Sequence, residues 1–265
     1  MMMKTKIIVT IVVFSGLWLA SPYLGHAQER LFIAYTSDLC SDMPVLSCFV
    51  PTSYAGLRFR NDFGTKELMH AEFSGNYKIQ RNCLLASVTH YGYADYGNAQ
   101  LAVGYGRDFG ERFAFSGRIQ YIMEHARGYP TRHSLCTDFG FAFKFSKKVM
   151  LFSAVHNPFM MRYGIVGQDV IPLKFTIGCV YAPVQKLLLS AITAKDLPGG
   201  WEIGCRFTTQ PATPLLITVD GTNTHLGLTI HWIHKTFLFS VKTAWYYRIS
   251  VSPEIGGYYY PDNNP

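Results

Sequence analysis

Apolar and polar side chains alternate with a period of two from residue 54 onward, which is the pattern of β-strands. In Arg112–Tyr121, one face carries Phe113, Phe115, Ile119 and Tyr121, and the other carries Ala114, Ser116, Arg118 and Gln120. The pattern predicts fourteen strands. They span Tyr54–Arg60, Lys66–Ile79, Cys83–Tyr91, Ala99–Arg107, Arg112–Met123, Ser134–Phe145, Val149–His156, Leu173–Ala182, Lys186–Ala194, Trp201–Thr208, Leu215–Val219, His225–Trp232, Thr236–Tyr247 and Glu254–Tyr260.

The connections between these strands alternate in length. Tight turns follow even-numbered strands, at Gln80–Asn82, Asp108–Glu111, Ser146–Lys148, Pro183–Gln185 and Ile233–Lys235. Longer loops follow most odd-numbered strands, at Gly92–Asn98, Glu124–His133, Asn157–Pro172, Lys195–Gly200 and Arg248–Pro253. Thr209–Pro214 is an exception, because it is a longer link after the tenth strand. One rim of the sheet is therefore predicted to carry short turns and the other to carry long loops.

The face opposite the large apolar residues is built mostly from Gly, Ala, Ser and Thr with isolated charges. In a soluble sandwich or lipocalin-like barrel, this face would be the outer one and would need to be solvent-exposed and rich in charged residues. In a transmembrane barrel the arrangement is inverted, because large apolar residues meet lipid and small or polar ones line the interior. A sheet in lipid must also close so that every backbone group is paired. The favoured fold is therefore an all-β, closed antiparallel transmembrane barrel of residues 54–260, with short turns toward the periplasm, long loops outside and a tail at 261–265.

Composition supports this interpretation. The chain has 265 residues, of which 49% are hydrophobic and 15% aromatic, but only 15% are charged, compared with about a quarter in soluble domains. The formal charge of +7 is spread without basic runs, so no nucleic-acid partner is predicted. Aromatic residues near strand ends are candidates for interfacial girdles, namely Tyr91, Tyr105, Tyr121, Tyr181, Trp201, Trp232, Trp245 and Tyr260.

The N-terminal segment carries an export signal. Lys4 and Lys6 precede the apolar stretch Ile7–Ala20, and Gly25-His26-Ala27 is a small-x-small cleavage site. Residues 1–27 are therefore predicted to be a cleaved signal peptide, although an uncleaved anchor is the alternative. Residues 28–53 have no long period and are expected to be irregular with at most one short helix. A barrel of this width needs filling, so this segment is a candidate partial plug of the periplasmic mouth.

The six cysteines are too few for a disulfide-dense scaffold, and their spacings match no zinc motif, so no metal site is predicted. Cys40 and Cys48 lie close together before the first strand and form a possible disulfide in an oxidising compartment. The other four are expected to behave as small apolar residues within strands.

Residues 60–121 carry motifs of a known barrel type. An N-x-F-x-x-K-E-L-like hairpin begins at Asn61, a V-x-x-Y-G-Y strand end begins at Val88, and A-V-G-Y-G-R-D-F-G-E-R-F begins at Ala102. This region resembles the front half of the PorV/PorQ-type outer-membrane barrels, which are relatives of the long-chain fatty-acid transporter fold in bacteria with type IX secretion. The resemblance implies a fourteen-stranded barrel and a secretion or surface-attachment accessory. The chain departs from the pattern at Val50-Pro51-Thr52, where Asn-Pro-Ala is often found, and in ending beyond Tyr258-Tyr259-Tyr260 with Pro261 to Pro265.

Charged and polar side chains on the small-residue face are candidate lumen residues. They are His70, Glu72, Lys78, Arg118, Asp138, Lys144, Glu202, Arg206 and Lys242. Basic residues outnumber acids in this set, which favours an anionic solute by field focusing or reflects internal pairing within the lumen. A solvated network that neutralises its own charges is preferred over a catalytic site at His70 and Ser74.

The longest loop, Asn157–Pro172, has an apolar tip formed by Phe159, Met160, Met161, Arg162 and Tyr163. Such a tip is either an extracellular docking loop for a partner or a loop that folds back over the barrel mouth.

Three functions from different classes follow. The first is a non-enzymatic outer-membrane barrel of the PorV/PorQ type that works with secretion-system proteins. The second is a fatty-acid-transporter-like channel for hydrophobic or small anionic solutes. The third, an unfavoured lipid hydrolase, lacks a Gly-x-Ser-x-Gly motif. The predicted partners are outer-membrane lipid and either secretion proteins or a hydrophobic solute, with no cofactor.

Overall fold

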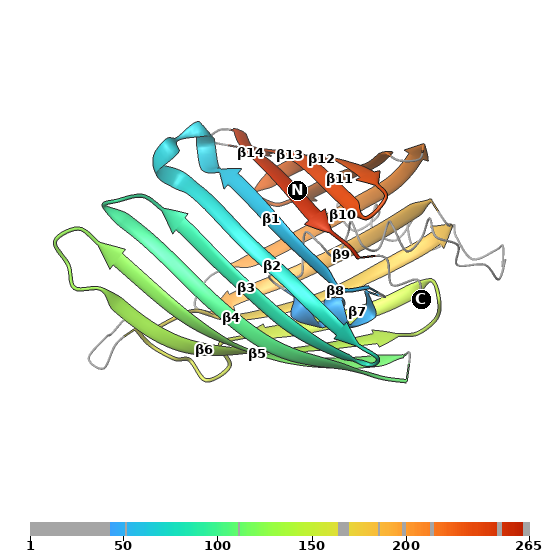
Figure 1. Ribbon diagram of the computed structural model, residues 1–265, viewed down its shortest axis with the longest axis horizontal. Helices are drawn as coiled ribbons and strands as arrows, with labels where there is room; N and C mark the ends of the chain where they lie inside the picture. Colours follow the sequence, from blue (N-terminus) through green and yellow to red (C-terminus); the bar gives the residue numbers. More distant parts are fainter. Residues whose placement is uncertain are drawn as a thin grey trace, which may run out of the picture.

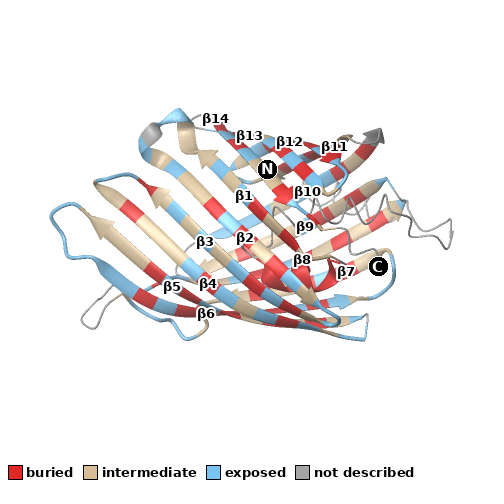
Figure 2. Cartoon of the chain, in the orientation of Figure 1, coloured by how far each residue is buried: buried red, intermediate tan, exposed pale blue. Residues whose placement is uncertain are grey.

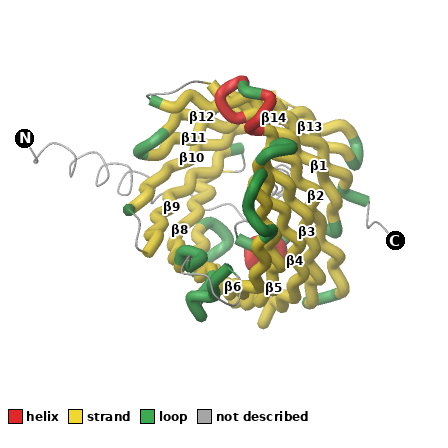
Figure 3. Tube along the Cα trace, turned by 90° about the vertical axis from the view of Figure 1, so that its left-hand side faces the viewer, coloured by secondary structure: helices red, strands yellow, loops and turns green. Residues whose placement is uncertain are grey.

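The computed structural model describes residues 43–50, 52–110, 112–163, 170–184, 186–197, 200–212, 215–247 and 251–261. The predicted signal peptide lies outside these residues, as does the N-terminal segment before Met43. The described residues form a closed antiparallel barrel in which consecutive strands pair and β14 closes on β1 (Figures 1 and 3). This confirms the predicted fold class and all fourteen strands.

The strands are β1 Tyr54–Asn61, β2 Met69–Ile79, β3 Asn82–Gly92, β4 Tyr96–Phe109, β5 Phe113–Ala126, β6 Arg132–Lys144, β7 Val149–His156, β8 Leu173–Val184, β9 Leu187–Leu197, β10 Trp201–Ala212, β11 Leu215–Thr222, β12 His225–His234, β13 Phe237–Tyr246 and β14 Val251–Tyr259. Three short 3-10 helices accompany them, namely η1 Pro44–Phe49, η2 Asp62–Gly64 and η3 Lys66–Leu68. No helix in the described part of the chain is long and apolar enough to cross a membrane.

Several predicted boundaries differ from the observed ones by a few residues, and two of these differences change the interpretation. Strand β10 continues to Ala212 through a register shift between Thr209 and Ala212, so the link to β11 is a short turn and the predicted exception disappears. Strand β2 begins at Met69, because residues 66–68 form η3. With these corrections, every even-numbered strand from β2 to β12 is followed by a short turn, and we call this side the short-turn end. The opposite side is the long-loop end.

The barrel wall is apolar outside and small or polar inside. Along β12, Leu226, Leu228, Ile230 and Trp232 are exposed, whereas Thr229 and His231 are buried. The same alternation of buried and exposed residues runs along the strands in Figure 2. A surface of this kind is stable in lipid, whereas in water it would expose a large apolar area. The described strands therefore form a membrane-spanning wall.

Two predicted girdle residues point the other way. Tyr91 is on the lumen side of β3, where its ring lies 6.4 Å from that of His70. Tyr260 is buried in a cluster with Tyr54 and Tyr258 inside the barrel. Strand β3 ends at Gly92 and β14 at Tyr259, so both residues lie within one residue of a strand end, as predicted for a girdle. The face depends on parity along the strand, and parity places both residues on the lumen side. Tyr105, Tyr121, Trp201, Trp232 and Trp245 are exposed, as expected of a girdle.

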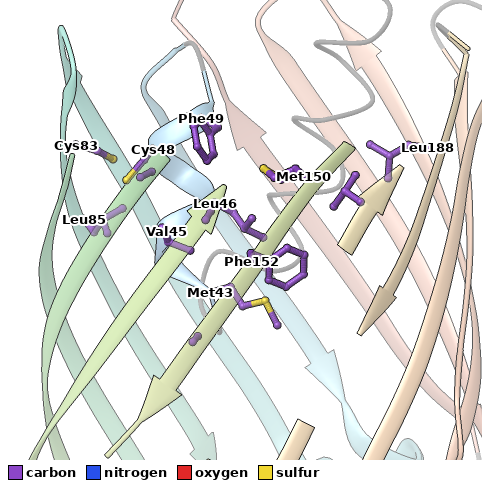
Figure 4. Close-up of a cluster of buried hydrophobic side chains, with 14 residues drawn as sticks. Met43, Val45, Leu46, Cys48, Phe49, Cys83, Leu85, Met150, Phe152 and Leu188 are labelled. Carbon is purple, nitrogen blue, oxygen red and sulfur yellow. The ribbon is translucent and has the colours of Figure 1, made fainter. Parts of the chain in front are cut away.

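The interior has two zones. In the plugged zone, at the short-turn end, η1 lies inside the barrel and all six of its residues are buried. Figure 4 shows Val45, Leu46 and Phe49 of this helix turned toward inward-facing side chains of the wall. The surrounding apolar residues are Cys83, Leu85, Ala114, Ala142, Met150, Phe152, Ala154, Val180 and Leu188. A neighbouring cluster joins Val50 to Tyr54, Leu216, Ile233, Leu238, Tyr258 and Tyr260. The cavity zone, described next, lies between the plugged zone and the long-loop end.

Candidate functional site

A cavity of about 600 Å³ lies in the lumen above η1. Met43 is at its base, and the lining reaches His225 and Tyr246, at the ends of β12 and β13 that join long loops. Its charged lining residues are Arg58, Arg60, Glu72, Arg118, Asp138, Lys174, Glu202, Arg206, Asp220, Lys242 and Glu254. A volume of this size is typical of sites for small organic ligands. The cavity is therefore the candidate functional site.

At the base of the cavity, η1 makes specific contacts with the wall. The Lys78 ammonium donates a hydrogen bond to the Cys48 carbonyl, and Asn76 Nδ2 donates to the Ser47 carbonyl at 3.4 Å. Lys144 Nζ lies 4.0 Å from the centroid of the Phe49 ring. The Lys78 and Asn76 side chains thus donate to carbonyl groups of η1 inside the barrel, and the Ser47 carbonyl also accepts from Val50 N at 3.2 Å. They fix the position of η1 across the lumen.

Two wall glycines make room for η1. A Cβ atom at Gly106 would lie 2.3 Å from Cys48 Sγ, and one at Gly140 would lie 2.9 Å from Val45 Cβ. Both distances are shorter than van der Waals contact, so larger residues at these positions would displace η1. The small residues on the lumen face thus have a packing role that alternation alone does not reveal.

The first charged cluster of the cavity joins β1, β2 and β14. Arg58 Nη2 lies 2.5 Å from Glu72 Oε2, and Arg58 Nη1 lies 3.8 Å from Glu254 Oε1. Arg58 and Glu72 are direct cross-strand partners, so strand register places the two charges side by side.

The second cluster joins β5, β6 and β7. Asp138 accepts hydrogen bonds from Arg118 Nε at 2.7 Å and shares one with His156 Nδ1 at 2.5 Å. Arg118 and His156 are the register partners of Asp138 on its two sides. Each carboxylate oxygen of Asp138 therefore has its own partner.

The third cluster joins β11, β12 and β13. The Asp220 carboxylate lies 3.2 Å from Lys242 Nζ and 3.3 Å from His225 Nε2. All three clusters consist of buried or half-buried groups, for which unpaired charge would be costly. The cavity is therefore a preorganised polar surface in which positive and negative groups alternate around the wall.

The predicted lumen residues divide between the two zones. His70, Glu72, Arg118, Asp138, Glu202, Arg206 and Lys242 line the cavity. Lys78 and Lys144 contact η1 instead. Arg58, Arg60, His156, Asp220 and Glu254 also line the cavity but were not predicted to do so. Asp220 was missed because its strand was predicted to end at Val219, and the others occupy lumen positions that parity along β1, β7 and β14 would have indicated.

The loop after β7 is held together by one buried side chain. Asn157, which is fully buried, accepts from Met161 N at 2.9 Å and donates to the Ile171 carbonyl at 2.7 Å, so it pins the two sides of the loop together. Tyr163 packs against the buried Ile122, Cys136 and Ile171. Burial, followed by the charge of Glu124, raises the pKa of Tyr163 above its usual value.

The tip of the same loop faces outward. Phe159 is 66% exposed and its ring meets that of Phe139 edge to face at 6.4 Å. Met160 and Met161 are also exposed, and Arg162 forms an isolated bridge with Val170. The loop thus folds inward at Tyr163 and presents its apolar tip along the outside of the wall. A docking role for this tip stays a prediction.

The predicted Cys40–Cys48 disulfide lies partly outside the described residues, because Cys40 is not among them. Cys48 is buried in the plugged zone, with its Sγ 4.0 Å from the Phe115 carbonyl. Cys83 and Cys136 are buried, Cys179 is half-buried and Cys205 is exposed.

The hydrolase hypothesis does not fit the geometry of β2. His70 and Ser74 are four residues apart on one strand, which separates their Cα atoms by about 13 Å. A nucleophile and its base need hydrogen-bond contact. His70 and Ser74 therefore cannot act together as a base and its nucleophile.

Comparisons with known proteins place the fold. No family model matches the chain, and no curated protein sequence matches it. Among solved structures, the Pseudomonas putida toluene transporter TodX has a TM-score of 0.64 at 7% identity over 83% of this chain and 91% of its own. The monoaromatic hydrocarbon channel CymD has a TM-score of 0.63 at 6% identity over 93% and 96%. A Pseudomonas aeruginosa FadL homologue has 0.52 at 9% identity over 84% and 92%. The chain therefore has the fold of these outer-membrane channels.

Proposed function

We propose that this protein is an outer-membrane channel that admits a small amphipathic solute with an anionic group. The observation that carries the proposal is the cavity of about 600 Å³, which reaches the long-loop end and has the buried helix η1 at its base. A chamber that is accessible from one side and plugged on the other suits a solute that is captured first and released when the plug moves. The fold shared with hydrocarbon channels supports transport as the general activity.

The charged lining distinguishes this lumen from a site for a plain hydrocarbon. Eleven Arg, Lys, Asp and Glu residues line it, among them Lys174 on β8 and Arg206 on β10. Transfer of an apolar molecule to such a surface forgoes the gain from apolar burial, whereas a carboxylate can exchange water for charge-assisted hydrogen bonds. Met43, Ala154 and Ile192 provide apolar contacts for the remainder of the solute.

Flux measurements in proteoliposomes test this proposal. The probes are a medium-chain carboxylate, the alcohol of the same chain length and toluene. We expect carboxylate flux above that of empty liposomes, and a several-fold loss of it in the double variant Lys174→Ala/Arg206→Ala with less change for the alcohol. Lys147→Ala, in the exposed turn between β6 and β7, is the matched control. Equal carboxylate flux in the double variant, or no flux in the wild type, would refute the proposal.

A second candidate is the secretion-accessory role implied by the PorV/PorQ resemblance. The observation in its favour is the exposed apolar tip Phe159–Met161 beside the barrel wall. Affinity purification from a type IX secretion strain, with wild type and with Phe159→Ser/Met160→Ser, tests it. Recovery of secretion components by the wild type alone supports this role. Equal recovery by both proteins would show that the apolar tip does not bind these components.

A further inference from the structure

Three potential metal ligands converge in the cavity zone. Cys136 Sγ, a carboxylate oxygen of Asp138 and a ring nitrogen of His156 all lie within 4.8 Å of one another. Cys136 and Asp138 are two apart on the lumen face of β6, and His156 is the direct partner of Asp138 on β7. Because His156 is brought in by strand register, the sequence spacing that defines common zinc motifs does not show this group.

We infer that these three residues bind one borderline-soft divalent ion with the coordination chemistry of Zn²⁺. Thiolate, imidazole and carboxylate together favour Zn²⁺ and similar ions over Mg²⁺ or Ca²⁺, which prefer oxygen ligands alone. Tetrahedral Zn–S and Zn–N bonds place neighbouring donor atoms about 3.5 Å apart. The three donor atoms lie within 4.8 Å of one another, but His156 Nδ1 is only 2.5 Å from Asp138 Oδ1. Ion binding therefore requires this hydrogen-bonded pair to open by roughly 1 Å and the more distant donors to close by a similar amount. Rotation of the partly exposed His156 ring allows both movements.

The neighbouring residues suit this role. Arg118 holds one oxygen of Asp138 through Nε at 2.7 Å and Nη2 at 2.5 Å, which leaves the oxygen facing His156 for the ion. Cys136 Sγ donates to Gln120 Oε1 at 3.4 Å. After loss of the thiol proton, the Gln120 amide can turn and donate its N–H to the thiolate. Such partners of the ligands orient them and tune the affinity of metal sites.

The ion has a path and an open coordination position. Arg118, Gln120, Asp138 and His156 all line the cavity, and the His156 side chain is 31% exposed. Three protein ligands with a fourth position open to solvent is the arrangement of a site that binds a water or a solute group. Binding forms a bond between the metal and Cys136 Sγ, and the thiol proton passes to solvent through the cavity. His156 binds as the neutral imidazole, by transferring its Nδ1 proton to Nε2 if Nδ1 is the ligating atom.

Cobalt titration of the full-length protein in detergent tests this inference, with Co²⁺ as the spectroscopic probe. We expect one equivalent to bind, a thiolate-to-cobalt charge-transfer band in the near ultraviolet, release of about one proton per ion, and displacement by Zn²⁺. Cys136→Ser should abolish the band. Cys179→Ser, which removes a thiol from the opposite side of the wall, is the matched control and should leave the band unchanged.

A second variant covers the case in which Cys136→Ser does not fold. His156→Gln should keep heat-modifiable gel migration, which reports the folded barrel, and weaken Co²⁺ binding by at least about tenfold. The inference is overturned if the folded wild type shows no band, if Cys136→Ser folds and retains it, or if His156→Gln binds as tightly as the wild type. None of these readouts depends on solute flux, so this site and the proposed channel function are tested separately.

Discussion

The plugged zone and the cavity zone are built from the same strands but have opposite chemistry. On β7, Met150 and Phe152 are buried against η1, and His156, four residues after Phe152, lines the cavity. On β11, Leu216 is buried in the apolar cluster, whereas Asp220 pairs with Lys242 in the cavity. The inward face of the barrel therefore changes from apolar to charged along the axis.

This difference separates two ways of filling a wide barrel. In the plugged zone, η1 packs against the wall with all six of its residues buried, so close packing determines the structure. In the cavity zone the space stays open, and ion pairs between neighbouring strands hold the wall in shape. The predictions below test this contrast, beginning with the largest expected effect.

Breaking an ion pair in the cavity zone should cost the most. Arg118→Leu leaves the buried Asp138 without its cationic partner, and we expect the free energy of unfolding to fall by about 3–5 kcal/mol. Denaturant titration of the barrel in detergent, followed by tryptophan fluorescence, measures this. The control is Arg127→Leu, which removes an exposed pair with Asp95 and should change stability by less than about 1 kcal/mol. Equal losses in both variants would contradict a preorganised cavity.

Truncation of the plug core should have the next largest effect. Leu46→Ala removes a fully buried side chain of η1, and we expect a loss of about 2–4 kcal/mol because of the cavity left behind. Leu57→Ala is the comparison, since Leu57 is 50% exposed on the outer wall and lipid or detergent can fill the space. A larger loss from Leu57→Ala would show that η1 is not closely packed.

Crowding the plug should displace it. Gly106→Val places side-chain atoms where Cys48 Sγ lies, and overpacking of this kind costs about 1–3 kcal/mol. Maleimide labelling of Cys48, in a variant whose other cysteines are serine, should then be faster by about tenfold or more, since 1.4 kcal/mol corresponds to tenfold. Gly117→Val faces outward and should leave the labelling rate unchanged. If both variants label at the wild-type rate, η1 does not depend on Gly106.

The smallest effect is expected for the cation above the plug. Lys144→Met removes the ammonium group from the Phe49 ring but keeps an apolar side chain. We expect a loss of about 1 kcal/mol, which is typical of a cation–π contact. The same denaturant titration measures this loss. A loss as large as that of Arg118→Leu would mean that Lys144 makes stabilising contacts besides the one with the Phe49 ring.

Much of the fold could be predicted from the sequence. Alternation identified all fourteen strands, since each strand in a barrel wall separates lipid from lumen residue by residue. It also placed Glu72, Arg118 and Lys242 on the lumen side, where the structure has them. Parity along the strand predicts the face of a residue better than its aromatic character does, because Tyr91 and Tyr260 are aromatic but lie on the lumen side.

Depth along the barrel could not be predicted in this way. Alternation gives the side of the wall but not which inward residues meet η1, so Lys78 and Lys144 could not be separated from the cavity residues. The register between neighbouring strands could not be predicted from alternation either, because register depends on how the strands pair. The contacts among Cys136, Asp138 and His156 therefore emerged only from the structure.

The central claim is that η1 closes the lumen below a solute chamber. Single-channel recording in planar bilayers tests it most directly, with the wild type compared with a variant in which residues 44–49 are replaced by a Gly-Ser linker of the same length. We expect a small wild-type conductance that rises several-fold in the variant, while heat-modifiable migration shows that the barrel is folded. An unchanged conductance in the folded variant would contradict it.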